Sequence, residues 1–314
     1  MIVTVTPNPS LDRTIAVAGL ARGEVHRGLR ADLDPGGKGV NVARVLAAAG
    51  RPTTSLLPCG GPEGAHLGSL LRDERVPVVE VPVHGATRSN VTVVEADGTT
   101  TKFNESGSPL DSGEARELVD RAAELAAGAE WLVACGSLPA DGSEHLHADL
   151  VRAGRRAGAR TAVDTSGPAL AHAAAAGPDL IKPNHDELAE LAGRPLPTLG
   201  AVLDVARDLR ARGVGAVLVS LGADGALLAE GAGAWHARSA PTVIVSTVGA
   251  GDALLAGFLG AGGAGPEALR AAVAHGAAAV GLPGSRMPGP QDPRSASVRV
   301  TAVDTALTLT GAAR

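Results

Sequence analysis

The chain has 314 residues, 45% of them hydrophobic, and a formal net charge of −5. This is enough for a buried core, in one α/β domain with a small appendage or in two domains. The weakly acidic balance excludes the electrostatic footprint of a nucleic-acid-binding protein, and no apolar run reaches the roughly 18 residues of a membrane span.

The first expected element is a strand at residues 2–5, and no basic segment precedes it as it would in a signal peptide. Only two cysteines follow, Cys59 and Cys135, so the sequence indicates neither a disulfide framework nor a zinc cluster. This cysteine usage suits a reducing compartment. We therefore expect a soluble, cytoplasmic protein without nucleic-acid or membrane partners.

Short β-rich runs alternate with Ala- and Leu-rich stretches along most of the chain. The expected strands are residues 2–5, 53–57, 78–81, 131–135, 160–164, 180–182 and 216–220. The expected helices are residues 40–49, 63–74, 112–127, 145–157 and 199–212. This alternation predicts a mainly parallel sheet with helices on both faces, and ligands of such sheets bind outside the carboxyl ends of the strands.

Two segments, residues 13–33 and 89–103, contain strand-like runs with no helix between them. In the second, Ala96-Asp97-Gly98 predicts the turn of a hairpin. We expect these strands to form a small sheet that projects from the core, with its open face covered by a partner subunit or by the active site. The proline-containing tail, residues 285–299, is expected to be irregular.

The segment after the first strand carries polar side chains and glycines. Asp12 ends the run Pro7-Asn8-Pro9-Ser10-Leu11-Asp12, where it either binds sugar hydroxyls or begins a turn. In Asp34-Pro35-Gly36-Gly37-Lys38-Gly39, the glycines can present backbone amides and Lys38 adds charge. The run matches neither the Walker A loop nor G-x-G-x-x-G. Taken by itself, the run fits a tight turn with an exposed lysine better than a binding site.

Lysine is rare in this Arg-rich chain. Of 28 basic residues only Lys38, Lys102 and Lys182 are lysine, and each lies in an expected loop or strand end. A lysine kept against such a bias suits a site that needs a compact, mobile positive charge. Chance is a fair explanation for any one of them and a weaker one for all three.

Two further motifs follow expected strands. In Lys182-Pro183-Asn184-His185-Asp186-Glu187, Asn184 and Glu187 lie three residues apart on one helical face, which suits water-mediated contacts with magnesium. Helix capping is the main alternative for both side chains. Ser220-Leu221-Gly222-Ala223-Asp224-Gly225 forms another glycine turn, which fits beside a nucleotide.

The most informative motif is Thr247-Val248-Gly249-Ala250-Gly251-Asp252, which precedes a helical run of apolar and small residues. Gly249 and Gly251 allow a tight turn whose amides point out of a helix N-terminus, where an anion is favoured. Asp252 in such a turn suits a base that faces a phosphoryl group in transfer. Helix capping is an equally good interpretation of this acid from the motif alone.

Together these motifs resemble the ribokinase-like PfkB family of sugar kinases over almost the whole chain. The likeness is greatest to 1-phosphofructokinases and tagatose-6-phosphate kinases. It rests on the segments Thr6–Asp12, Gly36–Arg44, Thr87–Val91, Lys102–Glu105, Gly136–Pro139, Lys182–Asn184 and Thr247–Asp252. The resemblance implies one ribokinase-like α/β domain over residues 1–314, with lid strands inserted at about 13–33 and 87–105.

The resemblance also implies a role for each matched residue. Asp252 would be the catalytic base, with the amides of Gly249, Ala250 and Gly251 holding the transferred phosphoryl group. The implied substrate-binding residues are Asp12, Gly36, Gly37, Lys38, Asn41, Arg88, Lys102 and Ser137. The implied ATP-binding residues are Lys182, Asn184, Ser220, Gly222, Gly225 and Thr247. Asn184 and Glu187 would hold Mg²⁺ through water, and two copies of the chain would form a homodimer through the lid.

The predicted reaction is ATP-dependent phosphorylation of a phosphorylated ketohexose, foremost D-fructose 1-phosphate. Tagatose 6-phosphate and fructose 6-phosphate are the alternatives within this class, and a noncatalytic sugar-phosphate sensor is the alternative outside it. Lys38 favours the first two sugars, because the minor 6-phosphofructokinases of the family can have glycine there. The chain departs from its relatives at Ser106-Gly107-Ser108, where they commonly read Pro-Gly-Pro.

Overall fold

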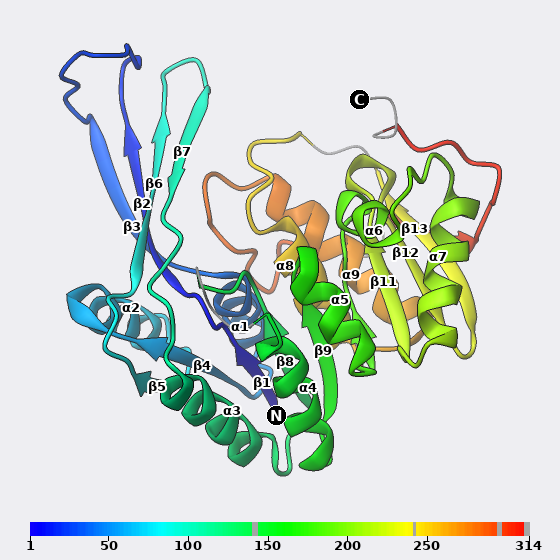
Figure 1. The fold of residues 1–314 in the computed structure, drawn as a ribbon. Coiled ribbons are helices and arrows are strands. Elements are labelled where there is room, and N and C mark those ends of the chain that lie inside the picture. The colour runs from blue at the N-terminus through cyan, green and yellow to red at the C-terminus, as the bar shows by residue number, and fades with distance from the viewer. Residues whose placement is uncertain (140–143, 241–242, 294–296, 311–314) are drawn as a thin grey trace.

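The computed structural model describes residues 1–139, 144–240, 243–293 and 297–310. Its main sheet has ten strands in the order β14-β13-β12-β11-β10-β9-β8-β1-β4-β5 (Figure 1). Their bounds are β1 Ile2–Val5, β4 Thr53–Cys59, β5 Val78–Pro82, β8 Trp131–Cys135, β9 Arg160–Asp164, β10 Leu180–Ile181, β11 Ala216–Ser220, β12 Ala226–Glu230, β13 Gly233–Ser239 and β14 Val298–Ala302. The strands from β5 to β11 are parallel, and β12, β13 and β14 are antiparallel.

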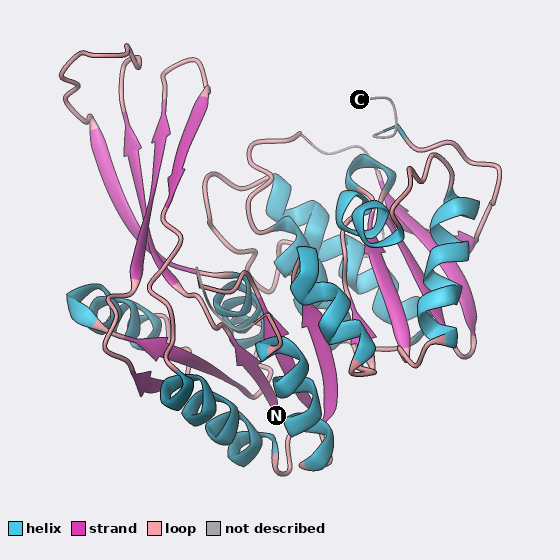
Figure 2. Ribbon diagram, viewed as in Figure 1, coloured by secondary structure: helices cyan, strands magenta, loops and turns pink. Residues whose placement is uncertain are grey.

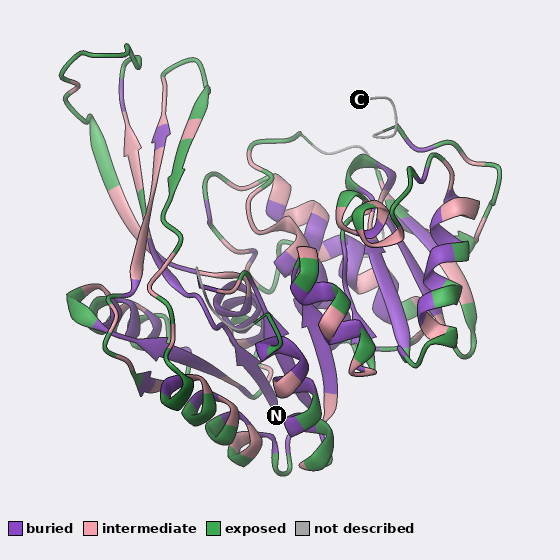
Figure 3. Ribbon diagram, in the orientation of Figure 1, coloured by how far each residue is buried: buried purple, intermediate pink, exposed green. Residues whose placement is uncertain are grey.

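Helices cover both faces of this sheet (Figure 2). Their bounds are α1 Lys38–Ala48, α2 Gly61–Asp73, α3 Ser112–Ala126, α4 Leu146–Arg156, α5 Gly167–Ala175, α6 His185–Ala192, α7 Leu199–Ala211, α8 Ala250–Gly260 and α9 Gly265–Val280. Side chains alternate between the faces, as strand β8 shows. Leu132 and Ala134 pack in the core with α3 to α7, whereas Trp131, Val133 and Cys135 pack in the core with α1, α8 and α9. The strands from β4 to β12 in the order of the sheet are accordingly almost wholly buried, whereas β5, β13 and β14 are partly exposed (Figure 3).

The predicted strands and helices are present with ends that shift by a few residues. The prediction of an irregular tail over residues 285–299 is wrong at its end, because β14 begins at Val298 and pairs with β13 through Ser239↔Val298. Residues 294–296 of that tail lie outside the described residues. Strand β14 is an edge strand with exposed Arg299 and Thr301, so its sequence lacks the apolar run of a central strand.

A second sheet of four strands projects from the body (Figure 1). It consists of β2 Ser10–Ala16, β3 Arg30–Gly36, β6 Arg88–Val94 and β7 Thr100–Asn104 in the order β3-β2-β6-β7. The predicted hairpin is β6 and β7, with Asp97 and Gly98 in its turn. We call this sheet the lid. Because β2 follows β1 after only a short proline-containing link, the lid is rooted at the carboxyl end of the main sheet.

Two helices begin at glycines that no other residue replaces without strain. Gly37, before α1, has a φ of 117°, and a Cβ there would lie 2.8 Å from Thr6 Cγ2. Gly249, before α8, has a φ of 73°, and a Cβ there would lie 2.3 Å from Met287 Cε. Helices α1 and α8 pack against each other, so their two glycine turns open into the same region. Among the described residues, no helix has both the length and the apolar character to cross a membrane.

Candidate active site

A cavity of about 450 Å³ lies between the lid and the carboxyl ends of the central parallel strands. Its lining residues are Asn8, Ser10, Asp12, Gly37, Lys38, Asn41, Arg88, Asn90, Gly136, Ser137, Asp164, Ser166, Lys182, Asn184, Glu187, Ser220, Val248, Gly249, Gly251 and Asp252. Residues from both predicted glycine turns are in this set. Asp164 ends β9, and Ser220 ends β11, as expected for a site at the carboxyl edge of a parallel sheet.

Asp252 is a buried carboxylate in the first turn of α8, with 6% of its surface exposed. Its Oδ2 accepts a hydrogen bond of 2.8 Å from Asn41 Nδ2 rather than from an amide of its own helix. Burial, and next the negative charge of Asp164, raise the pKa of Asp252 to about 6. The raised pKa makes Asp252 a stronger base than an ordinary aspartate while leaving it largely ionised at neutral pH.

Asp164 holds the two cavity lysines together. It is fully buried, with Lys38 Nζ 2.8 Å from Oδ1 and Lys182 Nζ 3.0 Å from Oδ2. Burial opposes ionisation of Asp164, but the charges of Lys182 and Lys38 outweigh it and lower the pKa of the carboxyl group. Burial likewise opposes the charge on Lys38, and the carboxylates of Asp164 and Glu187 raise its pKa above the usual value. Lys38 therefore stays charged inside the cavity.

Asn184 and Glu187 form a capping box at the start of α6. Asn184 Oδ1 accepts from the Glu187 amide at 2.8 Å, and Glu187 Oε2 accepts from the Asn184 amide at 2.8 Å. The capping interpretation therefore describes their mutual contacts. Glu187 Oε1 is directed to the cavity cations, 3.6 Å from Lys38 Nζ.

The lid side of the cavity is lined by side-chain amides and a carboxylate. Asp12 Oδ1 accepts from Ser10 Oγ at 2.7 Å and from Asn90 Nδ2 at 2.9 Å. Asn41 and Asn90 each donate through their NH₂ group, and their carbonyl oxygens are buried without a partner in the described part of the chain. Buried polar atoms of this kind are normally satisfied, so these oxygens are available to hydroxyl groups of a ligand.

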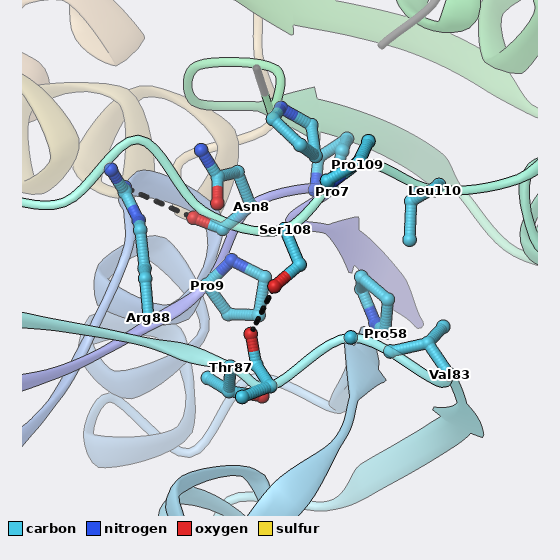
Figure 4. Close-up of a pocket in the computed structure, with 13 residues that line it drawn as sticks. Pro7, Asn8, Pro9, Pro58, Val83, Thr87, Arg88, Ser108, Pro109 and Leu110 are labelled. Carbon is cyan, nitrogen blue, oxygen red and sulfur yellow. Dashed lines mark hydrogen bonds between the residues drawn. The ribbon is translucent and has the colours of Figure 1, made fainter. Parts of the chain in front are cut away.

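Arg88 lies where the lid joins the body. Its Nη1 donates to Glu105 O at 2.9 Å and its Nη2 donates to Asn8 O at 3.0 Å, while burial lowers its pKa from the usual value. A void of about 20 Å³ lies behind this joint, and Figure 4 shows Arg88 reaching toward Asn8 at its border. On the other border, Ser108 Oγ donates to Ala86 O at 3.0 Å. Residues 86–88, which lead into β6, and residues 105–108, which follow β7, join the lid to the body, and we call them the lid hinge.

Several predicted site residues do not line the cavity. Lys102 is exposed on β7, where it pairs with Thr92 in the lid. Gly36 lies next to the lining, and a Cβ there would approach the Asp12 carboxylate to 2.4 Å. The remaining residues outside the lining are Gly222 and Gly225, at the two ends of a short 3-10 helix after Ser220, Thr247, which precedes the lining residue Val248, and Ala250, which begins α8.

The family model for pfkB family carbohydrate kinases matches residues 6–292. The chain belongs to this family. It is 41% identical over 305 residues to a 1-phosphofructokinase from Rhodobacter capsulatus, covering 92% of this chain and 93% of that one. It is 38% identical to the ATP-dependent 6-phosphofructokinase isozyme 2 of Escherichia coli, covering 91% and 94% of the two chains.

A solved structure of phosphofructokinase-2 from Escherichia coli superposes on this PfkB kinase with a TM-score of 0.88. The two sequences are 36% identical, and the match covers 93% of this chain and 96% of that one. The predicted ribokinase-like architecture, with a main sheet and a smaller separate sheet, is therefore confirmed. The predicted enzyme class, a sugar phosphotransferase, is confirmed by the family.

Sequence reasoning missed several residues of this kinase cavity, above all Asp164, Asn8 and Asn90. Asp164 offered one signal, because it ends a buried strand at the carboxyl edge. Asn8 and Asn90 lie within the family-like segments Thr6–Asp12 and Thr87–Val91, but no role was assigned to them from the sequence. Asn8 Nδ2 donates to Ser106 O at 2.9 Å, and it lies within hydrogen-bond distance of Leu138 O and Ser137 Oγ at 3.2 and 3.3 Å. These contacts join three segments distant in sequence, which no local pattern reveals.

Proposed function

We propose that this kinase transfers the γ-phosphoryl group of ATP to D-fructose 1-phosphate and forms fructose 1,6-bisphosphate. The observation that carries the proposal is the buried carboxylate of Asp252, which has a raised pKa and shares a cavity with the Asp164-bound lysines. The resemblance to relatives named 1-phosphofructokinase supports the choice of sugar. The unpaired amide oxygens of Asn41 and Asn90 suit a ligand rich in hydroxyl groups.

In the proposed reaction, Asp252 accepts the proton of the attacking sugar hydroxyl. The hydroxyl oxygen then bonds to the γ-phosphorus while the bond from that phosphorus to the ADP oxygen breaks. A base placed in this way contributes about 10²–10⁴-fold to the rate. Asn41, through its hydrogen bond to Oδ2, orients the carboxylate for this task.

The charge on the transferred group is met by two features of the chain. The amides at the start of α8, from Gly249 to Asp252, face outward from the helix N-terminus, where negative charge is favoured. Lys38 and Lys182 add positive charge that Asp164 keeps in place. Positioning and electrostatic stabilisation of this kind supply most of the catalysis in phosphoryl transfer.

The residues at the centre of the cavity fit a magnesium ion. Asp164 Oδ2 is buried and forms no hydrogen bond with good geometry, although Lys182 Nζ lies 3.0 Å away. Glu187 Oε1 lies 3.6 Å from Lys38 Nζ at the same cavity, and carboxylate oxygens are the ligands that Mg²⁺ prefers. Glu187 would hold the ion with Asn184, through water, and the bound ion would neutralise charge on the phosphates of ATP.

At the sugar end, Asp12, Asn41, Asn90 and Gly37 surround the hydroxyl groups in our proposal. Arg88 and Ser137, which also line the cavity, would bind the phosphate of the substrate, and Ser220 would lie beside ATP. Arg88 Nη1 and Nη2 each donate to one backbone carbonyl, which leaves each of them a second N–H for an anion. Lys102 would contribute only if the lid bends over the cavity.

Fructose 6-phosphate is the second candidate, because the chain also resembles 6-phosphofructokinases. The deciding experiment is an ADP-release assay with fructose 1-phosphate, fructose 6-phosphate and tagatose 6-phosphate at equal concentrations. We expect the highest kcat/KM with fructose 1-phosphate. Preference for either other sugar would replace the proposed substrate, and ATP turnover with none of them would favour a sugar-phosphate sensor.

We further propose that two copies pair through their lids and that the kinase acts in the cytoplasm. The lid carries exposed apolar side chains, including Leu20, Leu29 and Phe103, which is 58% exposed. Such side chains are commonly covered by a partner. The two free, buried cysteines are compatible with a reducing compartment.

A further inference from the structure

The inference concerns the peptide bond between Gly136 and Ser137, which follows β8 and borders the cavity. Gly136 has a φ of 99°, a conformation that L-residues rarely adopt. A Cβ at this position would meet no atom closer than 3.9 Å. Glycine is therefore required here by the backbone conformation and not by crowding, which indicates that the orientation of this peptide matters.

Both polar groups of Gly136 are anchored behind the cavity. Its amide donates to Asp164 O at 2.8 Å, and its carbonyl accepts from Thr165 Oγ1 at 2.9 Å. The same carbonyl accepts from His147 Nε2 at 2.9 Å, on the first turn of α4. Thr165 is 1% exposed and His147 is 0% exposed, so neither side chain can itself reach a ligand.

The state of His147 is set by these contacts. A carbonyl oxygen only accepts, so Nε2 carries the proton and Nδ1 carries the lone pair. Nδ1 is buried without a partner in the described part of the chain. Burial lowers the pKa of His147 to about 4, so the ring donates this hydrogen bond in its neutral form at physiological pH.

A trans peptide bond is planar, with its N–H pointing opposite to its C=O. Because two buried donors hold the Gly136 oxygen on the protein side, the Ser137 N–H points to the other side, where the cavity lies. Ser137 is exposed there, and its amide donates no hydrogen bond within the described residues. The amide is thus an oriented donor of the type that binds phosphate oxygens.

We propose that His147 and Thr165 are positioning residues that orient the Ser137 amide toward the phosphate of the sugar substrate. This inference rests on the proposed function for the identity of the ligand, a sugar phosphate, but not for the orientation itself. The two donors make the amide preorganised, so no energy is spent on turning the peptide when the substrate binds. They act through Gly136 and touch no reactant.

The test uses matched substitutions in the full-length enzyme. Thr165→Val removes the donor at nearly constant volume, and Thr165→Ser keeps the hydroxyl. His147→Leu removes the second donor, and His147→Gln keeps a donor of similar reach. We expect Thr165→Val and His147→Leu, each of which loses one of the two donors, to raise KM for the phosphosugar about 5- to 10-fold. KM for ATP should stay within twofold. This size of effect corresponds to the loss of one good hydrogen bond. The serine and glutamine variants should stay near wild type.

Equal KM values for Thr165→Val and Thr165→Ser would overturn the proposal, as would an equal rise in KM for both substrates. If His147→Leu fails to fold, the comparison of Thr165→Val with Thr165→Ser still tests the proposal. If the wild type turns over a phosphosugar other than fructose 1-phosphate, the proposed function fails and the same comparison is made with that sugar. If no sugar is turned over, a crystal structure of Thr165→Val decides: a rotated Gly136–Ser137 peptide supports the inference, and an unchanged peptide refutes it.

Discussion

At the scale of single residues, the site depends on a conflict between burial and charge. Asp252 and Asp164 are both buried carboxylates in one cavity, and the repulsion between them is one reason why the pKa of Asp252 is raised. Asp164 is compensated by two lysines, whereas among the described residues the direct hydrogen-bond partner of Asp252 is the side-chain amide of Asn41. The uncompensated carboxylate is the one we assign as the base.

Asp252→Asn should lower kcat by at least about 100-fold while leaving the affinity for ATP within a few-fold of wild type. Asparagine keeps the size of the side chain and can still accept from Asn41, but it cannot take a proton. The measurement is steady-state turnover together with ATP binding by calorimetry. Turnover close to that of the wild type would remove Asp252 as the base.

The same base predicts the pH dependence of catalysis. Asp252 must be ionised to accept a proton, so kcat/KM should be constant above its pKa of about 6 and fall tenfold per pH unit below it. The profile should be recorded from pH 4.5 to 8.5 with a coupling system calibrated at each pH. A profile that stays flat down to pH 5 contradicts the raised pKa.

The ionisation of buried Asp252 should also lower the free energy of unfolding in the pH range where the enzyme works. Its pKa rises from 3.8 in the unfolded chain to about 6 in the folded one, so the penalty is absent below about pH 4 and complete above pH 6. Asp252→Asn should therefore stabilise the fold at pH 8, by an amount of the order of 1–3 kcal/mol, and the gain should vanish near pH 4.

Thermal or urea unfolding of Asp252→Asn and wild type at the two pH values measures this difference. Asp120→Asn, at an exposed position on α3, is the matched control and should change stability little at either pH. If the gain in stability is the same at pH 4 and pH 8, its cause is not the titration of Asp252.

At the scale of elements, the lid hinge links the small sheet to the substrate cavity. Hydrogen bonds to distant segments hold the hinge segment Ser106-Gly107-Ser108 in place. Asn8 Nδ2 donates to Ser106 O, and Ser108 Oγ donates to Ala86 O. Gly107 is packed tightly against Asn8, since a Cβ there would lie 2.2 Å from Asn8 Oδ1.

Gly107→Ala should raise KM for the phosphosugar about 10-fold, because the added Cβ displaces Asn8 and, with it, Arg88 and Ser137. Gly98→Ala is the matched control. Gly98 and Gly107 both have a positive φ, of 90° and 85°, but a Cβ at Gly98 would meet nothing within 4 Å. This control should lose about 1 kcal/mol of stability without a change in KM. Equal KM values in the two variants would show that the hinge contact does not reach the site.

At the scale of the whole molecule, the proposed lid-to-lid dimer gives the exposed apolar residues of the small sheet a partner. Phe103 lies on β7, an edge strand of the lid, and is the largest exposed apolar side chain among the described residues. Phe103→Glu should convert the dimer to monomers at micromolar concentration, because a charge buried in an interface without a partner is costly.

Sedimentation velocity measures the change in mass. Val243→Glu, at an 80% exposed position outside the lid, is the control and should leave the dimer intact. A monomeric wild type, or dissociation by both substitutions, would contradict pairing through the lid.

The sequence by itself was sufficient for the alternating architecture and for the motifs at its loops. Apolar runs of strand length must be buried on both faces, so they predict central parallel strands such as β8 and β9 without knowledge of their neighbours. Glycine turns before α1 and α8 are likewise visible, because their backbone conformations restrict the residue type. The antiparallel strands β12, β13 and β14 were not predicted, and in β14 the exposed Arg299 and Thr301 interrupt the apolar run.

Tertiary structure alone decided which residues act together. Asp164 meets Lys38 across 126 positions of the chain, and Asn41 meets Asp252 across 211. The value of a carboxylate as a base depends on desolvation and on the charges around it, and both arise only when distant segments pack. The orientation of the Ser137 amide has the same origin. Local patterns specify which groups are present, and the fold determines their protonation and direction.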